Sequence, residues 1–290
     1  MALHTAPRPP APSRPPSRRS MLAWAAGGVV GVLVAIVVAL GVAGPSPAPA
    51  PAAQLPAAAA TPAAAPAADP EPIPAGLPLS TTYTTIGGAP RDTAATATDG
   101  IVVHPVHESV IYDSAGGRAI ARIQPAQFGD VWLPVIGQQP GWVRVLLPSK
   151  PNGSTGWLRA GDTTAARTPY TIAVHLESKR LDLRRGNDMV GSWTVGTGKA
   201  SAPTPAVRTF VLGAFRDPKQ KYSPVILPLG AHSPTLDSFG GGPGTVAIHT
   251  WPTDDVFGAA SSDGCIRVPS DALDHLTGVP LGTVVLITDD

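Results

Sequence analysis

Hydrophobic and polar positions divide the chain into one long apolar run and two later regions of short alternating runs. Residues 21–43 (MLAWAAGGVVGVLVAIVVALGVA) contain no charged residue and no polar face. Later runs such as WVRVLLP, TIAVHL and GTVVLIT are short, and Gly, Pro, Asn or Asp residues separate them. Apolar and polar residues that alternate with a period of two predict strands, so we expect a mainly β protein after one apolar helix.

The apolar run has the length of a membrane-spanning helix. At 1.5 Å per residue, residues 21–43 would extend about 34 Å, enough to cross a hydrocarbon core of about 30 Å. Residues 1–20 carry four arginines and no acidic residue, and the positive-inside rule keeps such a segment in the cytoplasm. We expect a single-pass anchor in the cell membrane, with everything after Ala43 outside. The alternative is a cleaved signal peptide, which would make the protein secreted.

Composition indicates that the next segment is a spacer. The chain has 35 prolines and 31 glycines, and prolines are dense in residues 44–78. Proline removes backbone donors and favours the extended polyproline II conformation. We interpret residues 44–100 as a linker, whose polar end (81–100) either extends the spacer or adds a short strand. The net charge of +1 provides no basic surface for nucleic acid, so no nucleic-acid partner is expected.

Residues 101–165 have the pattern of a small β-barrel. Turn signals separate short β-rich runs about every 8 to 12 residues. With Trp142 and Trp157 in Gly-Trp pairs, this region resembles a bacterial SH3-like domain. Trp132, Trp142 and Trp157 either line a ligand groove or, as is commoner in a small barrel, belong to the core. His104 and His107 are interpreted as surface histidines and not as metal ligands.

Residues 168–290 form the second predicted unit. Residues 171–198 predict two strands, with turn signals at Ser178-Lys179 and Gly186-Asn187, and a proline-punctuated loop (PTPAVRTFVLG) follows. The run VAIHTW predicts a further strand, and GTVVLIT predicts a last one. Between them, Ser270 and Asp271 are a plausible cap for a short helix. The unit is therefore expected to be mostly β, with one short helix near the cysteine.

Cys265 is the only cysteine of the chain. It lies sixteen positions after His249, and His249 is at the end of a predicted strand. In an exported protein such a cysteine is an intermolecular bridge, a buried apolar residue or a reactive thiol. A reactive thiol needs a base or cation that favours the thiolate, and donors for an oxyanion. The backbone amides of the turn 263–265 can supply those donors. The spacing alone leaves all three interpretations open.

The same residues carry a family resemblance. The chain from about Tyr170 to its end resembles the L,D-transpeptidase catalytic domain, whose signature is a strand-borne Ile-His, a loop, and then Ser-His-Gly-Cys before an aliphatic residue and Arg or Asn. The matching positions are Ile248-His249, Ser262-Asp263-Gly264-Cys265-Ile266-Arg267, and Pro203-Thr204-Pro205 at a family Thr-Pro-Thr turn. Two positions depart from the pattern. Asp263 replaces the usual histidine, and Thr250-Trp251 follows His249 where glycine is common.

The resemblance implies a peptidoglycan acyltransferase that uses no metal or cofactor. Cys265 would attack a donor tetrapeptide before its terminal D-alanine, and the side-chain amine of an acceptor stem would take the thioester, giving a 3→3 crosslink. His249 would be the base, and the Gly264 and Cys265 amides would be oxyanion donors, within a substrate-binding turn that includes Ser262 and Asp263. Arg267 would hold a substrate carboxylate or brace the loop. The alternative is an exported peptidoglycan-binding scaffold with little or no catalysis.

Asp263 poses an electrostatic question. A carboxylate two positions from the sulfur raises the pKa of a thiol, whereas a nearby imidazolium lowers it. A turn aspartate can instead bind its own backbone amides, which directs its charge away from the sulfur. We predict that Asp263 does so, and that His249 alone serves as the base.

Overall fold

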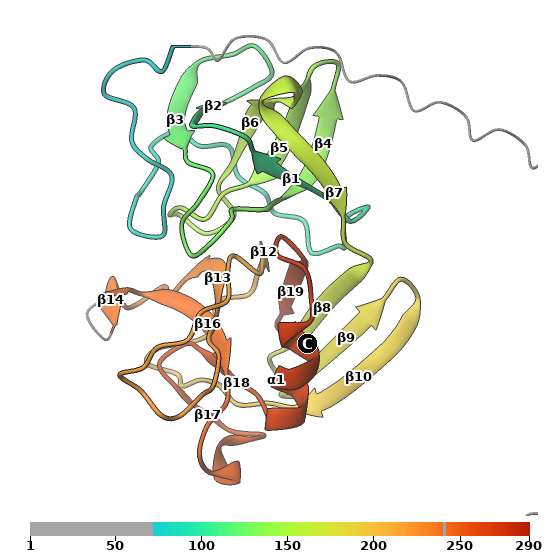
Figure 1. Cartoon of the computed structure of the whole chain (residues 1–290). Coiled ribbons are helices and arrows are strands. Elements are labelled where there is room, and N and C mark those ends of the chain that lie inside the picture. Colours follow the sequence, from blue (N-terminus) through green and yellow to red (C-terminus); the bar gives the residue numbers. More distant parts are fainter. Residues whose placement is uncertain (1–71, 240–241) are drawn as a thin grey trace, which may run out of the picture. The chain divides into compact units, whose positions relative to one another are not determined.

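A computed structural model describes residues 72–239 and 242–290. The predicted basic segment (1–20), membrane anchor (21–43) and most of the predicted spacer lie outside the described residues. In the described ranges, no helix is both long and apolar enough to span a membrane. These ranges are mainly β with one α-helix, which confirms that part of the predicted fold class (Figure 1).

The first sheet has seven strands in the order β3-β2-β6-β5-β4-β1-β7, all antiparallel. They are β1 (Ile101–Pro105), β2 (Ser109–Tyr112), β3 (Ala119–Ile123), β4 (Leu133–Gln139), β5 (Trp142–Leu146), β6 (Thr155–Arg159) and β7 (Thr163–Arg167), with a 3₁₀ turn at Ala160–Asp162 before β7. Aliphatic side chains such as Ile111 and Val145 fill the core of this sheet. The three tryptophans are only partly buried and are not among the residues that form this core. The resemblance to an SH3-like domain stays a prediction.

Residues 79–91, expected as the end of the spacer, lie against the first sheet. Isolated bridges join Leu79 to Arg122, Thr85 to Lys150 and Arg91 to Ser154. Ile86 is almost completely buried. The segment has few apolar residues, so its docking depends on hydrogen bonds to a distant part of the chain, which the sequence pattern does not reveal.

The second sheet has five strands in the order β10-β9-β8-β19-β12. They are β8 (Tyr170–His175), β9 (Arg180–Arg185), β10 (Asp188–Thr194), β12 (Val207–Phe210) and β19 (Val284–Thr288). The predicted turns are present, with positive φ at Lys179 and Gly186. Two expectations need correction. The first stretch contains three strands where two were predicted, and the predicted loop includes β12, because pairing with β19 stabilises an extended conformation there.

The remaining strands are short and surround the predicted site. They are β11 (Thr197–Gly198), β13 (Leu227–His232), β14 (Ser238–Phe239), β15 (Gly242–Pro243), β16 (Thr245–His249), β17 (Ala260–Ser262) and β18 (Ile266–Arg267), with a 3₁₀ turn at Asp254–Val256. β18 pairs in parallel with β16, and β17 pairs in parallel with β11. Parallel pairing brings the cysteine turn beside two segments that precede it in the chain.

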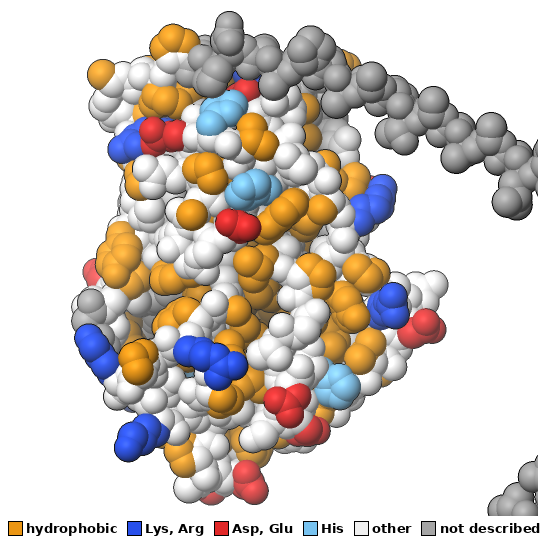
Figure 2. All heavy atoms as spheres, in the orientation of Figure 1, with side chains coloured by type: hydrophobic (Ala, Val, Ile, Leu, Met, Phe, Trp, Pro, Cys, Tyr) orange, Lys and Arg blue, Asp and Glu red, His pale blue; other side chains and the backbone are white. Residues whose placement is uncertain are grey.

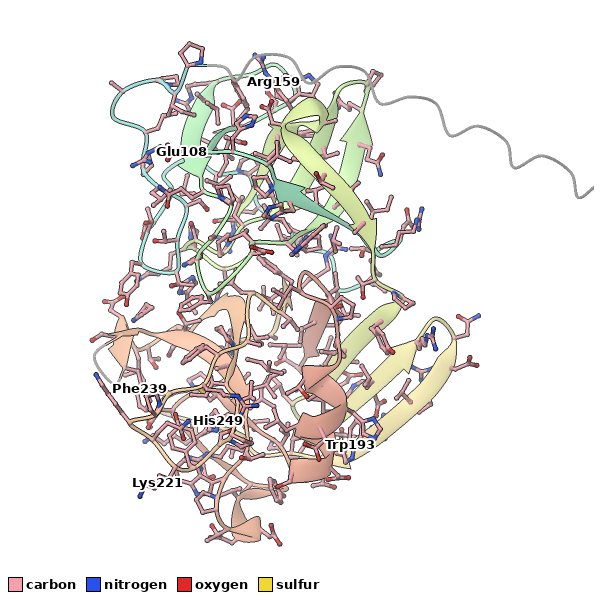
Figure 3. All side chains as sticks on the ribbon, viewed as in Figure 1. Glu108, Arg159, Trp193, Lys221, Phe239 and His249 are labelled. Atoms are coloured by element: carbon pink, nitrogen blue, oxygen red, sulfur yellow. The ribbon has the colours of Figure 1, made fainter. Side chains whose placement is uncertain are left out.

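Helix α1 (Ser270–Thr277) follows the cysteine turn, as predicted, but its expected cap is absent. Pro269 is the N-cap residue, and no side chain caps the helix. Asp271 instead accepts a hydrogen bond from the Trp193 indole at 2.8 Å, which places Trp193 beside the helix (Figure 3). The helix buries Leu273 and Leu276 in the core that the second sheet shares with β13, β16 and β18. This packing supports the strands that carry the predicted site.

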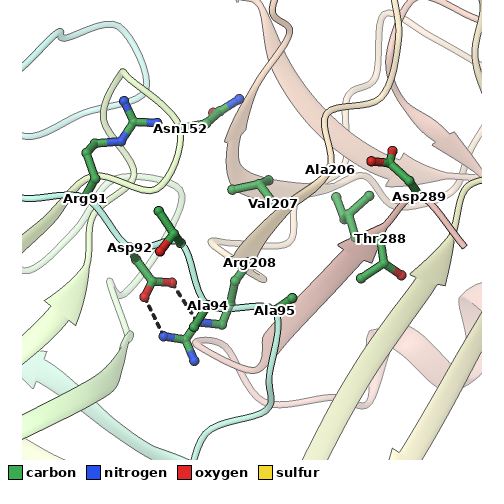
Figure 4. Close-up of a pocket in the computed structure, with 12 residues that line it drawn as sticks. Arg91, Asp92, Ala94, Ala95, Asn152, Ala206, Val207, Arg208, Thr288 and Asp289 are labelled. Carbon is green, nitrogen blue, oxygen red and sulfur yellow. Dashed lines mark hydrogen bonds and ion pairs between the residues drawn. The ribbon is translucent and has the colours of Figure 1, made fainter.

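The two predicted folded units share buried structure. Phe210 and Leu212, from the second unit, pack in the core of the first sheet. The Arg208 guanidinium makes two hydrogen bonds to the Asp92 carboxylate, at 2.7 and 2.8 Å, and both side chains are less than a tenth exposed (Figure 4). This ion pair lies in a hollow of about 500 Å³ whose lining contains none of the predicted site residues.

Breaking the buried ion pair should destabilise the protein. Asp92→Ala leaves the Arg208 guanidinium buried without its carboxylate, and such losses cost about 3–5 kcal/mol in the free energy of unfolding. The double variant Asp92→Leu/Arg208→Met, which removes both charges, should lose much less. Urea unfolding of the full chain measures both values. Equal losses in the single and double variants would contradict the prediction.

Candidate active site

His249 is the last residue of β16, where parallel pairing places it in register with Arg267 of β18. Its Nδ1 lies 2.8 Å from the Thr250 carbonyl oxygen. A carbonyl only accepts hydrogen bonds, so Nδ1 carries the proton and Nε2 keeps a free lone pair. The ring is buried, and burial lowers the pKa of His249 below its usual 6.5. His249 is therefore a neutral imidazole with the basic nitrogen available.

The cysteine turn is held by hydrogen bonds that surround Gly264. This residue has φ of +110°, a conformation that favours glycine. The Ser262 hydroxyl donates to the Cys265 carbonyl at 2.6 Å and accepts from the Gly264 amide at 3.2 Å. Thr204, in the predicted family turn, donates to the Gly264 carbonyl at 2.9 Å. The Gly264 amide is thus engaged, whereas the Cys265 amide has no acceptor among the described residues and is free to bind an oxyanion.

Asp263 does not bind its own turn, contrary to the prediction. Its Oδ1 lies 2.7 Å from the ammonium nitrogen of Lys199. The Gly264 amide instead donates a hydrogen bond to the Ser262 hydroxyl. Lys199 reaches the turn because β11 pairs with β17, and its own amide donates to the Ser262 carbonyl at 2.9 Å. The sequence contained no local signal for this partner.

The Cys265 thiol is neutral at rest. Burial raises its pKa above the usual 9.0, and the Asp263 carboxylate raises it further. The Ala247 backbone and the Arg267 guanidinium oppose these effects without cancelling them. In the described part of the chain, no hydrogen bond joins Cys265 to His249. The site therefore holds a neutral thiol directly before β18 and a neutral imidazole at the end of the neighbouring strand β16.

Two aromatic residues that the sequence analysis missed enclose His249. The Tyr222 ring centroid lies 5.0 Å from that of His249 and 5.5 Å from that of Trp251. Proximity to Cys265, after burial, raises the pKa of Tyr222, so this ring also lies near the sulfur. The Thr250 amide and hydroxyl bind Ser223 and Tyr222, which fixes this wall. In the sequence, Tyr222 is distinguished only as an aromatic residue in a proline-containing loop, which was the only signal available for its place in the site.

Arg267 stacks on Trp251, with its guanidinium carbon 3.8 Å from the ring centroid. Its Nη1 donates to the Ser261 hydroxyl at 3.2 Å. These contacts support the predicted bracing role. The Arg267 Nε is buried and has no partner among the described residues, so the role predicted for Arg267 in holding a substrate carboxylate stays a prediction.

Basic side chains border the site. Arg216, Lys219 and Lys221 are exposed in the loop before Tyr222, and none has an ion-pair partner in the described part of the chain. Lys221 and His249 lie on the same side of the protein (Figure 3), and Figure 2 shows Lys and Arg side chains gathered over the short strands there. Within the described residues, no three His, Cys, Asp or Glu side chains could hold a metal ion together.

Sequence comparisons identify the family of this chain. The sequence model of the YkuD family, described as the L,D-transpeptidase catalytic domain, matches residues 169–287. The chain is 31% identical over 136 residues to "Putative L,D-transpeptidase YqjB" of Bacillus subtilis (strain 168), covering 45% of this chain and 77% of that protein.

Two solved structures are also similar. L,D-transpeptidase 3 of Mycobacterium tuberculosis, in complex with a faropenem-derived adduct, is 12% identical with a TM-score of 0.38, covering 73% of this chain and 96% of that one. Bdellovibrio bacteriovorus Bd1075 is 22% identical with a TM-score of 0.34, covering 42% and 48%. Because both TM-scores are below 0.5, family membership rests on the sequence matches, and these are sufficient: the chain belongs to the L,D-transpeptidase catalytic domain family.

Proposed function

We propose that this protein is an L,D-transpeptidase that forms 3→3 peptidoglycan crosslinks through a thioester on Cys265. The observation that carries the proposal is the pairing of β16 with β18, which joins the His249 strand end to the Cys265 turn. The hydrogen bond from His249 Nδ1 to the Thr250 carbonyl leaves Nε2 free to accept a proton. The family acts on peptidoglycan stem peptides, so these are the proposed substrates.

In the first step, the Cys265 sulfur attacks the carbonyl carbon of the amide before the terminal D-alanine. The thiol proton passes to His249 Nε2 as the bond forms, since both groups are neutral at rest. The carbonyl oxygen becomes an oxyanion and accepts a hydrogen bond from the Cys265 amide. When the intermediate collapses, the C–N bond breaks and the leaving amine of D-alanine takes the proton from His249. The donor stem is then a thioester on Cys265.

In the second step, the side-chain amine of a diamino acid on an acceptor stem attacks the thioester carbon. His249 takes a proton from that amine, and the C–S bond breaks. The sulfur recovers a proton from His249, which restores the resting site. Water in place of the amine would give the free tripeptide, so the environment of the acceptor decides between crosslinking and hydrolysis.

The rest of the chain suits an enzyme of the cell wall. We propose that residues 21–43 anchor it in the cell membrane and that the proline-rich segment after them carries the enzyme outward. The partly buried tryptophans of the first sheet provide an aromatic edge for a wall ligand.

Muropeptide analysis tests the function. Purified full-length protein, incubated with disaccharide tetrapeptides, should produce 3→3 crosslinked dimers and release D-alanine, both detected by mass spectrometry. The reason is that the thioester can form only by expulsion of D-alanine. Binding of the tetrapeptides with neither product would contradict transpeptidation and favour the scaffold alternative.

A further inference from the structure

We propose that Lys199 is a positioning residue that compensates the charge of Asp263 beside Cys265, so that an ion pair replaces the histidine that the family usually has before its Gly-Cys pair. This inference rests on the proposed function. It assigns to Lys199 a part in the reaction that acts through a neighbouring side chain and not on the substrate.

The geometry holds the ammonium group of Lys199 on the cysteine turn. Its Nζ lies 2.7 Å from Asp263 Oδ1. The backbone of Lys199 is fixed on both sides, because its amide donates to the Ser262 carbonyl and its carbonyl accepts from the Ala202 amide, each at 2.9 Å. The lysine thus starts from a rigid position beside the turn, and a change of its side chain leaves these backbone bonds in place.

The ion pair between Lys199 and Asp263 has no other evident structural role. The two side chains are 47% and 40% exposed, and such exposed ion pairs contribute little to stability. The turn itself is held by Ser262 and Thr204, through hydrogen bonds to the backbone of residues 264 and 265. Asp263 takes part in none of these bonds. Its charge is therefore separable from the shape of the turn.

The charges around the sulfur explain why compensation is needed. Asp263 opposes negative charge on Cys265, and Arg267 favours it. Arg267 is held by its contacts with Trp251 and Ser261, whereas Asp263 is held by Lys199. His249 and Tyr222, the other titratable groups at the site, are neutral at rest. Asp263 is thus the anionic group that faces the thiol, and Lys199 is the cation bound to it.

Variants that remove the charge of Lys199 can isolate its effect on the Cys265 thiol in the full-length protein. We expect Lys199→Met to shift the pH profile of Cys265 alkylation by iodoacetamide upward by about half to one pH unit. At pH 7.5 alkylation would slow by about three- to tenfold, because only the thiolate reacts. Acylation by a carbapenem should slow by a similar factor, since negative charge develops on the same atoms. Thiolate absorbance in the ultraviolet gives a second reading of the same pH profile.

Three further variants serve as controls. Lys199→Arg keeps the charge and should behave as the wild type. Lys199→Met/Asp263→Asn removes both charges and should restore the wild-type profile or one at lower pH. Lys150→Met breaks a matched ion pair, with Asp237 at 2.9 Å, that does not include the cysteine turn, and should leave the profile unchanged.

An unshifted profile in Lys199→Met would overturn the proposal. A double variant as slow as Lys199→Met would overturn it as well, because the loss would then be structural. The proposed function fails in a different way: a chain that shows the alkylation shift but forms no acyl-enzyme retains the charge compensation and is not a transpeptidase.

Discussion

Full-length protein carrying Cys265→Ala is expected to gain no mass on incubation with a carbapenem, whereas the wild type gains one acyl group per chain. Carbapenems acylate the catalytic thiol of this family as mimics of the donor. Cys265 is the only thiol of the chain, and the methyl group of alanine cannot act as a nucleophile. Intact-protein mass spectrometry measures the result directly.

Cys265→Ser is a useful companion variant. It keeps the size of the side chain but replaces the thiol by a hydroxyl that is a much weaker nucleophile, so its acylation should also be lost or nearly so. Circular dichroism of both variants verifies that they fold. An adduct on Cys265→Ala would show that another residue is the nucleophile and would contradict the assignment of the site.

His249→Ala should slow acylation by at least about a hundredfold, as expected when a general base is lost. The pH dependence provides a sharper reading. Burial lowers the pKa of His249 below 6.5, and burial raises that of Cys265 above 9.0. Between these values the base is free and the thiol is protonated, so the wild-type rate should be nearly flat from about pH 6.5 to 9.

Without the base, only the small thiolate fraction reacts, and the rate of His249→Ala should rise about tenfold per pH unit over the same range. His275→Ala is a matched control, because this histidine lies in helix α1 with its ring tilted against that of Trp193 and takes no part in the site. A wild-type rate that rises steeply with pH, parallel to that of His249→Ala, would show that His249 is not the base.

Several features of the fold could be predicted because they depend on local pattern. Alternating residues predicted β8, β9, β16 and β19, and the predicted turns are present, with positive φ at Lys179 and Gly186. The periodic run after the cysteine predicted helix α1. Strand β12 was missed because its sequence is proline-flanked and becomes extended only by pairing with β19, a partner far along the chain.

The features of the candidate site also divide into those that depend on local sequence and those that depend on distant parts of the chain. The family motif around Cys265 and the strand that ends at His249 consist of contiguous residues, so the sequence alone was sufficient to identify the family and to propose these two residues as the reactive groups. Local turn chemistry also suggested a partner for Asp263, and that prediction was wrong.

Only the tertiary structure decided what surrounds these groups. Lys199 on Asp263 and Tyr222 on His249 are contacts between segments that strand pairing and loop packing bring together. The pKa values of the thiol and the imidazole depend on burial, and burial is a property of the packed chain and not of the motif. The sequence by itself therefore determined the family and the candidate reactive groups, and the tertiary structure decided the protonation and charge environment of those groups, because Coulomb interactions and desolvation act through space.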